Sequence, residues 1–143
     1  MGRKEDRAHT FSLVFQLPHI NTNDIEAVVE AYYGGLETGK KGINTKFVKS
    51  GFEGVIQNLD EIDKKIKAVL TDWDLNRLAA ADFAILRLAV FELAFSDEVP
   101  PKVAINEAVE LAKVYSSEDA PKFINGVLGG VSKSLEADNG ESL

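Results

Sequence analysis

The sequence of 143 residues contains no cysteine and only two histidines. Without cysteine, the chain can form no disulfide, thiol nucleophile or cysteine-ligated zinc site. A helical di-metal site needs two carboxylate–histidine pairs and further facing carboxylates, whereas this sequence offers one pair, Asp6 and His9. Ser12 lies near His9 but has no orienting acid in sequence. We therefore expect no metal, no cofactor and no catalytic residues.

Long apolar runs and excess positive charge are also missing. No run approaches the roughly 20 apolar residues that cross a bilayer, and the polar residues 1–10 are not followed by the apolar stretch of a signal peptide. We expect a cytoplasmic protein without membrane contact.

Lys and Arg number 16 against 23 Asp and Glu, which gives a net charge of −7. Nucleic-acid binding would therefore need a local basic patch or a partner that supplies one, and composition alone favours a protein-binding module.

Hydrophobic periodicity is the strongest positive signal, and it is clearest in residues 103–130. Apolar side chains recur at helical spacing through Ala104, Ala108 and Leu111, and a second stripe follows after the sequence SSED. Ser117 is a good N-cap, and Pro121 is tolerated only near a helix start. Two helices are predicted here, the second beginning at Ser117.

The same periodicity predicts helices over 5–17, 23–38, 44–57, about 59–70 and 75–95. Residues 75–95 are apolar nearly all round, which is typical of a buried central helix. No segment has strand periodicity. The prediction is an all-α protein of about seven helices in one domain over 1–143, arranged as two packed bundles over about 1–58 and 59–136.

Three of the charges within the apolar segment 75–95 lie beyond its first turn, and each needs a partner or an exit to water: Asp82, Arg87 and Glu92. We expect Arg87 to pair with Glu107 or Glu110 of the next helix. Glu110 is also spaced for a surface ion pair with Lys113.

Three segments carry a specific resemblance: DFAILRLAVFEL at 82–93, INEAVELAK at 105–113 and KFINGVLGG at 122–130. They resemble the NusB family of bacterial transcription antitermination factors, and the likeness continues more weakly through Arg7 and Phe15 to the amino terminus. It implies a non-catalytic protein that pairs with NusE, a small-subunit ribosomal protein. It further implies binding to the boxA sequence of ribosomal RNA transcripts and action with RNA polymerase.

Carried onto this sequence, the resemblance implies an RNA-binding stretch at Arg3, Lys4 and Arg7, RNA contact by Phe15, Asp119 and Phe123, and NusE contact by Asp82. Lys122 is added because it stands beside Phe123 at a helix start, where free backbone N–H groups favour phosphate. From the residues alone, Arg3, Lys4 and Arg7 could be a solvated helix start, which Glu5 and Asp6 interrupt. Periodicity would also allow Phe123 to be a core residue.

Two other functions stay open. The chain could be a helical interaction module that has lost RNA binding, which the charge of −7 favours. It could also be a homologue of the RNA-binding domain that precedes some ribosomal RNA cytosine methyltransferases, although no methyltransferase segment is present. A homodimer is a further alternative, because an unpartnered protein-binding face can self-associate.

Overall fold

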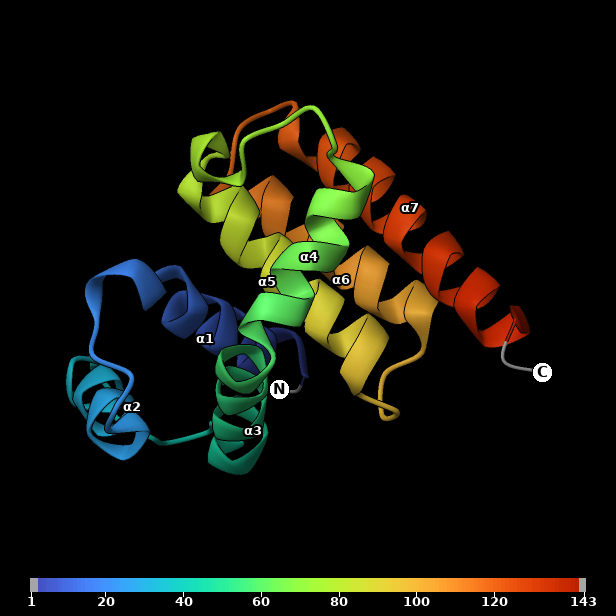
Figure 1. The fold of residues 1–143 in the computed structure, drawn as a ribbon. Helices are drawn as coiled ribbons and strands as arrows, with labels where there is room; N and C mark the ends of the chain where they lie inside the picture. Colours follow the sequence, from blue (N-terminus) through green and yellow to red (C-terminus); the bar gives the residue numbers. More distant parts are fainter. Residues whose placement is uncertain (1–2, 142–143) are drawn as a thin grey trace.

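The computed structural model describes the backbone of residues 3–141 and the side chains of residues 4–138. Within these residues the protein is entirely helical, which confirms the predicted fold class (Figure 1). The elements, in chain order, are α1 (Arg3–Phe15), the 3-10 helix η1 (Leu17–His19), α2 (Ile25–Gly34), α3 (Thr45–Gln57), α4 (Leu59–Val69), the 3-10 helix η2 (Leu75–Arg77), α5 (Ala80–Phe95), α6 (Pro101–Tyr115) and α7 (Ala120–Glu141).

Side-chain caps explain where two helices of the amino-terminal half begin. The Asp24 carboxylate accepts a hydrogen bond of 3.0 Å from the N–H of Ala27, and the Asn44 side chain accepts one of 3.1 Å from the N–H of Phe47. Each cap satisfies a backbone donor that the first turn leaves free. α2 and α3 therefore start directly after these two residues.

α5 occupies the centre of the molecule, as its apolar sequence predicts. It contacts α1, α3, α4, α6 and α7, and Ile85, Leu86 and Val90 on it are fully buried (Figure 1). Residues from all seven α-helices join one continuous hydrophobic cluster. No helix within residues 3–141 is both long and apolar enough to span a membrane. The division into two bundles near residue 58 stays a prediction.

Two glycines of α3 let this helix approach its neighbours closely. A Cβ atom on Gly54 would overlap the ring of Phe91 on α5, and one on Gly51 would lie 3.0 Å from the Thr10 methyl group on α1. Any larger residue would force the helices apart or displace the facing side chain. α3 is thereby seated against both α1 and α5.

Several predicted helix boundaries were wrong. The helix predicted over 23–38 ends at Gly34 and is followed by turns. Residues 75–95 do not form one helix, because Leu78 and Ala79 adopt extended backbone between η2 and α5. Asp74 caps η2 by accepting a 3.0 Å hydrogen bond from the N–H of Asn76. The last helix begins at Ala120 and not at Ser117, since the Ser117 carbonyl accepts the N–H of Ala120 in a turn that precedes the helix.

Candidate nucleic-acid interface

The end of α1 lies beside the end of α6, and aromatic rings join them. The buried Phe11 ring has its centroid 6.0 Å from that of Phe15 and 4.9 Å from that of Tyr115. Phe15 is 44% exposed and Tyr115 is 46% exposed. The contact therefore joins two segments far apart in sequence and leaves a ring open to solvent on each side of a buried one.

The turn after Tyr115 is attached to the start of α5. The hydroxyl of Ser116 donates a hydrogen bond to the carboxylate of Asp82, which lies in the first turn of α5 and is nearly buried. This bond satisfies one of the three charges that interrupt the central helix. Asp82, which the resemblance associates with NusE, thus adjoins the turn that leads to residues 119–123.

The start of α7 carries three of the predicted RNA-binding residues. Asp119 and Lys122 are exposed, whereas Phe123 is half-buried and packs partly against the core. The ring of Phe123 also faces Trp73, with 5.7 Å between the ring centroids. The sequence pattern predicts no role for Trp73. The available signal was a single tryptophan in a short polar turn between two helices.

At the other end of α1, Lys4 is exposed and lines a hollow of about 210 Å³ between α1 and α6. Val114 and Tyr115 contribute to the same hollow, so a cation and an exposed ring share it. The side chain of Arg3 lies outside the described residues.

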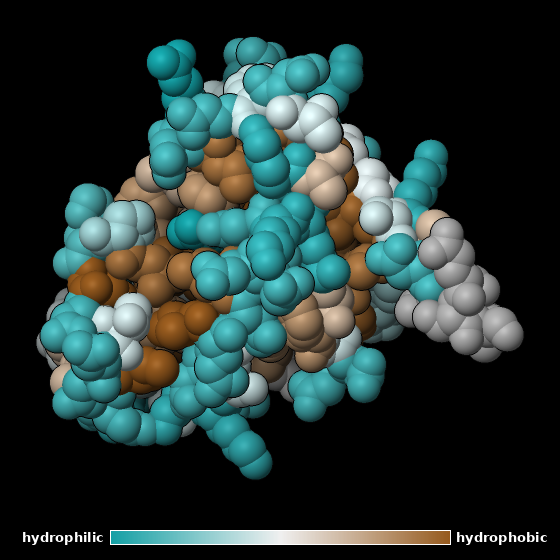
Figure 2. Space-filling view, in the orientation of Figure 1, coloured by the Kyte–Doolittle hydropathy of each residue, from teal (hydrophilic) through white to brown (hydrophobic). Residues whose placement is uncertain are grey.

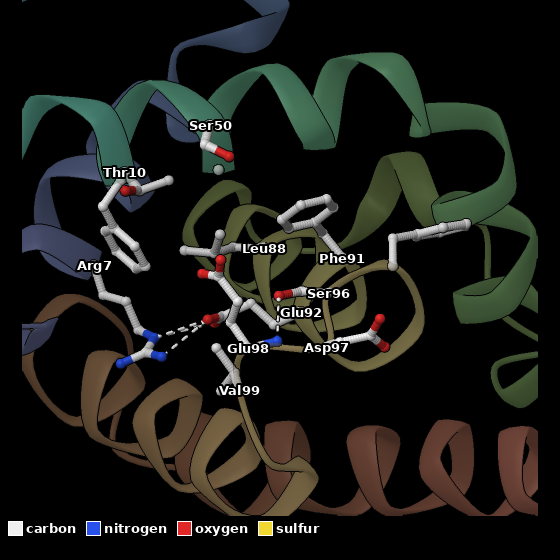
Figure 3. A pocket seen from close by; sticks show the side chains of 13 residues that line it. Arg7, Thr10, Ser50, Leu88, Phe91, Glu92, Ser96, Asp97, Glu98 and Val99 are labelled. Atoms are coloured by element: carbon white, nitrogen blue, oxygen red, sulfur yellow. Dashed lines mark hydrogen bonds and ion pairs between the residues drawn. The ribbon is translucent and has the colours of Figure 1, made fainter.

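Arg7 does not face solvent with Lys4, so its expected position in an exposed basic patch was wrong. Its side chain is 6% exposed, its Nε donates to both carboxylate oxygens of Glu92 at 3.1 Å, and its Nη2 donates to Oε2 at 3.0 Å (Figure 3). Glu107 lies 3.7 Å from Nη1. Burial of this side of α1 against α5 and α6 is possible because these carboxylates neutralise the guanidinium.

Arg87 also has a different partner from the one expected. Its guanidinium donates two hydrogen bonds, of 3.0 and 2.9 Å, to Asp63 on α4, and it stacks 3.7 Å from the ring centre of Phe83. Glu107 is instead turned toward Arg7.

The ion pair between Lys113 and Glu110 forms as predicted, at 2.8 Å. The hydrogen bond from Lys113, followed by its charge, lowers the pKa of Glu110. The Lys113 charge is therefore already neutralised near the α6 end.

Phe15 borders a second hollow, of about 550 Å³, on its other side. The lining combines rings, a guanidinium and an amide, contributed by Phe15, Phe83, Arg87 and Asn76. On the face seen in Figure 2, hydrophobic side chains gather over α1 and α2 beside the polar surface of α4. The exposed end of α1 is thus bordered by a hollow with both apolar and polar lining.

The one carboxylate–histidine pair of α1 makes contacts that do not suit metal binding. Asp6 accepts a 3.1 Å hydrogen bond from the N–H of Asn44, and His9 Nδ1 lies 2.6 Å from the hydroxyl of Tyr32. Both side chains join α1 to neighbouring segments. The structure is thus an all-helical protein with exposed aromatic rings at the ends of α1 and α6 and exposed lysines on α1 and α7.

Comparison with known proteins gives the family. The model of the NusB family matches residues 4–133. Transcription antitermination protein NusB of Clostridium novyi is 37% identical over 134 residues, which cover 94% of this chain and 100% of that protein. The corresponding protein of Thermoanaerobacter sp. is 35% identical, with 99% of this chain and 98% of that protein covered. The chain belongs to the NusB family.

Solved structures agree. T. maritima NusB superposes with a TM-score of 0.80 and 35% identity, covering 93% of this chain and 92% of that one. NusB in a crystal structure of antitermination factors NusB and NusE with double-stranded RNA superposes with a TM-score of 0.73 and 27% identity, covering 92% and 96%.

Proposed function

We propose that this protein is a non-catalytic transcription antitermination factor that binds boxA RNA of ribosomal RNA transcripts. It pairs with a NusE-type ribosomal protein and works in the cytoplasm within the antitermination complex of RNA polymerase. The observation that carries the proposal is the contact of the Phe11 ring with the rings of Phe15 and Tyr115. This contact joins the end of α1 to the turn before α7, and both segments carry predicted RNA-binding residues. The names of the relatives and of the NusB–NusE–RNA structure support the same role.

Each of the proposed RNA-binding residues has a distinct task. Phe15 and Phe123 offer rings on which unpaired bases stack. Lys4 and Lys122 are exposed cations for phosphate. Backbone N–H groups at the start of α7 add little, because that of Ala120 donates to Ser117, that of Phe123 donates to Asp119, and Pro121 has none. Arg3 adds a further cation at the start of α1. Asp119 lies one helical turn before Phe123 and can accept hydrogen bonds from base amino groups.

Arg7 serves this face indirectly. Its guanidinium is held by Glu92 and Glu107, so it orients α1, and with it Lys4 and Phe15, against α5 and α6. We therefore assign phosphate contact on α1 to Lys4 and Arg3 and not to Arg7.

The partner protein meets the RNA at the α6–α7 turn in this proposal. Asp82 holds Ser116 in the turn and lies at the start of α5, so a partner that contacts α5 there is next to residues 119–123. With a net charge of −7 the chain alone neutralises few phosphates. A second RNA-binding protein held nearby raises the effective concentration of the shared RNA.

The test is fluorescence anisotropy of labelled boxA RNA, with and without NusE, at two salt concentrations and beside a scrambled RNA. We expect selective, salt-sensitive binding that NusE strengthens. NusE binding without RNA binding in any condition would instead establish the interaction module. Sedimentation of the free chain in the same buffer determines whether it forms a homodimer.

A pair of lysines on one helix provides the matched control. Lys122 and Lys133 are both exposed on α7, but only Lys122 adjoins Phe123. Affinity for RNA falls as salt rises, and Lys122→Ala should make the slope of log affinity against log salt less steep by about 1. Lys133→Ala should leave this slope unchanged. Equal slopes for both variants would show that Lys122 does not contact an RNA phosphate.

A further inference from the structure

Trp73 is the one tryptophan of the sequence, and it stands in the turn between α4 and η2. It is 48% exposed, although an indole is among the side chains that gain most from burial. Its ring and that of Phe123 are inclined by 44°, with their centroids 5.7 Å apart. Rings tilted in this way do not cover one another fully, so the indole keeps an open face beside Phe123.

Hydrogen bonds hold the backbone that carries this indole. The N–H of Trp73 donates to the carbonyl of Leu70 at 3.0 Å. The ammonium of Lys67 donates to the carbonyl of Thr71 at 3.2 Å and also to the carbonyl of Trp73. A loop held in place before binding loses little conformational entropy when a ligand arrives, which favours recognition.

The charges around the indole determine which kind of ligand group can stack on it. Asp72 and Asp74 flank Trp73 and are both exposed, and they repel phosphate. The nearby cation Lys67 is directed to backbone carbonyls. Lys122, next to Phe123 in the chain, is an exposed cation that is not flanked by carboxylates in sequence. A flat, uncharged group suits the indole, and an anion suits Lys122.

We propose that Trp73 and Phe123 form a stacking platform for one unpaired RNA base, with Lys122 receiving a phosphate beside it. Lys67 is a positioning residue, because it acts through the loop that presents the indole. The inference rests on the proposed function and extends the RNA surface from the α1–α6 edge to the loop between α4 and η2.

Since Trp73 is the sole tryptophan, its fluorescence reports on the platform directly. One titration of labelled single-stranded boxA RNA follows label anisotropy for binding and tryptophan emission for stacking. We expect the emission to be quenched with the same dissociation constant as the anisotropy change. Binding with unchanged emission overturns the platform and leaves the proposed function intact. Absence of any anisotropy change, both with and without NusE, overturns both.

Affinities of variants separate stacking from a structural role. Trp73→Ala should weaken binding about tenfold at both salt concentrations without changing the salt slope, because stacking releases no counterions. Trp73→Phe keeps a ring and should recover most of the affinity. A Trp73→Ala variant that loses stability but binds RNA normally would show that the indole only covers Phe123.

The positioning role of Lys67 has its own control on the same helix. Lys67→Met should weaken binding, and it should lower the steady-state anisotropy of tryptophan emission in the free protein by loosening the loop. Lys64→Met removes an exposed cation of α4 that pairs with Glu61 and should change neither. Equal behaviour of the two variants would show that Lys67 does not position the loop.

Discussion

The guanidinium of Arg7 and the carboxylate of Glu92, 85 positions apart in the chain, form a buried ion pair with three hydrogen bonds. Each side chain is 6% exposed. The pair joins the first helix to the central one, and Glu107 extends it to α6. The orientation of α1 therefore depends on an electrostatic contact deep between three helices.

Replacing Arg7 should destabilise the fold. In Arg7→Ala the carboxylate of Glu92 stays buried without its partner, a loss of about 3–5 kcal/mol in the free energy of unfolding by urea. Lys113→Ala, which breaks the exposed pair with Glu110, should change the free energy of unfolding far less, because water screens exposed charges. The double variant Arg7→Met, Glu92→Leu should recover most of the loss because the more deeply buried carboxylate, Glu92, is removed together with the guanidinium, and only the more exposed Glu107 loses its partner. Near-native stability of Arg7→Ala would contradict the structural role.

A methyl group at Gly54 should be costly, and one at Gly126 should not. Gly54→Ala places Cβ into the Phe91 ring, which must move, so we expect a loss of about 1–3 kcal/mol. Gly126 on α7 has nothing within 4 Å of such an atom. Gly126→Ala should therefore stabilise the helix by up to about 1 kcal/mol. Urea unfolding of both variants checks the contrast, and equal effects would show that α3 and α5 are not tightly seated.

Phe15 should matter for RNA, whereas a similarly exposed phenylalanine should not. Phe15 is 44% exposed beside the α6 end, and Phe95 is 40% exposed at the far end of α5. Phe15→Ala should weaken boxA binding by about 1–3 kcal/mol, the typical contribution of stacking to one base. Phe95→Ala serves as the control in the same anisotropy assay. Equal losses would point to a general effect on folding and away from a contact by Phe15.

Stability should fall in strongly alkaline solution because of two neighbouring tyrosines. Burial raises the pKa of Tyr32 and the pKa of Tyr33 above the usual 10.0, and for Tyr33 the charge of Tyr32 adds to the effect. Below that value both hydroxyls are neutral in folded and unfolded chains. As pH rises past about 10 the unfolded chain ionises first, so folding is disfavoured.

The corresponding measurement is the free energy of unfolding between about pH 8 and pH 11 for the native chain and for the double variant Tyr32→Phe, Tyr33→Phe. Other groups titrate in both proteins, so the difference between the curves isolates the two hydroxyls. The variant should lose less stability over this range. Parallel curves would show that burial does not disfavour the phenolates.

Local pattern was enough to predict the helices but not the partners of the charged groups. The apolar spacing of Ala104, Ala108 and Leu111 predicts their burial directly, because residues about one helical turn apart lie on the same face of a helix. The break at Leu78 escaped prediction because Leu75, Leu78 and the alanines after it continue the apolar sequence of α5, and no glycine or proline separates η2 from α5. An apolar run looks the same whether it is one helix or two elements that share a core.

The candidate site shows the same limit. Lys122 was expected at a helix start, and its exposure there follows from local sequence. Arg7 was predicted to be a surface residue. Its carboxylate partners come from α5 and α6, and spacing along one helix cannot reveal them. Trp73 lacked a periodic context altogether. Its place beside Phe123 depends on how α4 and α7 pack.

The packing of α1 on α5 also has a consequence for synthesis on the ribosome. The buried Leu13 and Val14 of α1 leave the ribosome long before α5 exists. The 85 positions between Arg7 and Glu92 correspond to about 4–17 s of translation at about 5–20 residues per second. For that interval the nascent chain exposes an apolar face and an unpaired arginine. The contact between α1 and α5 is therefore completed only after α5 has been made, long after α1.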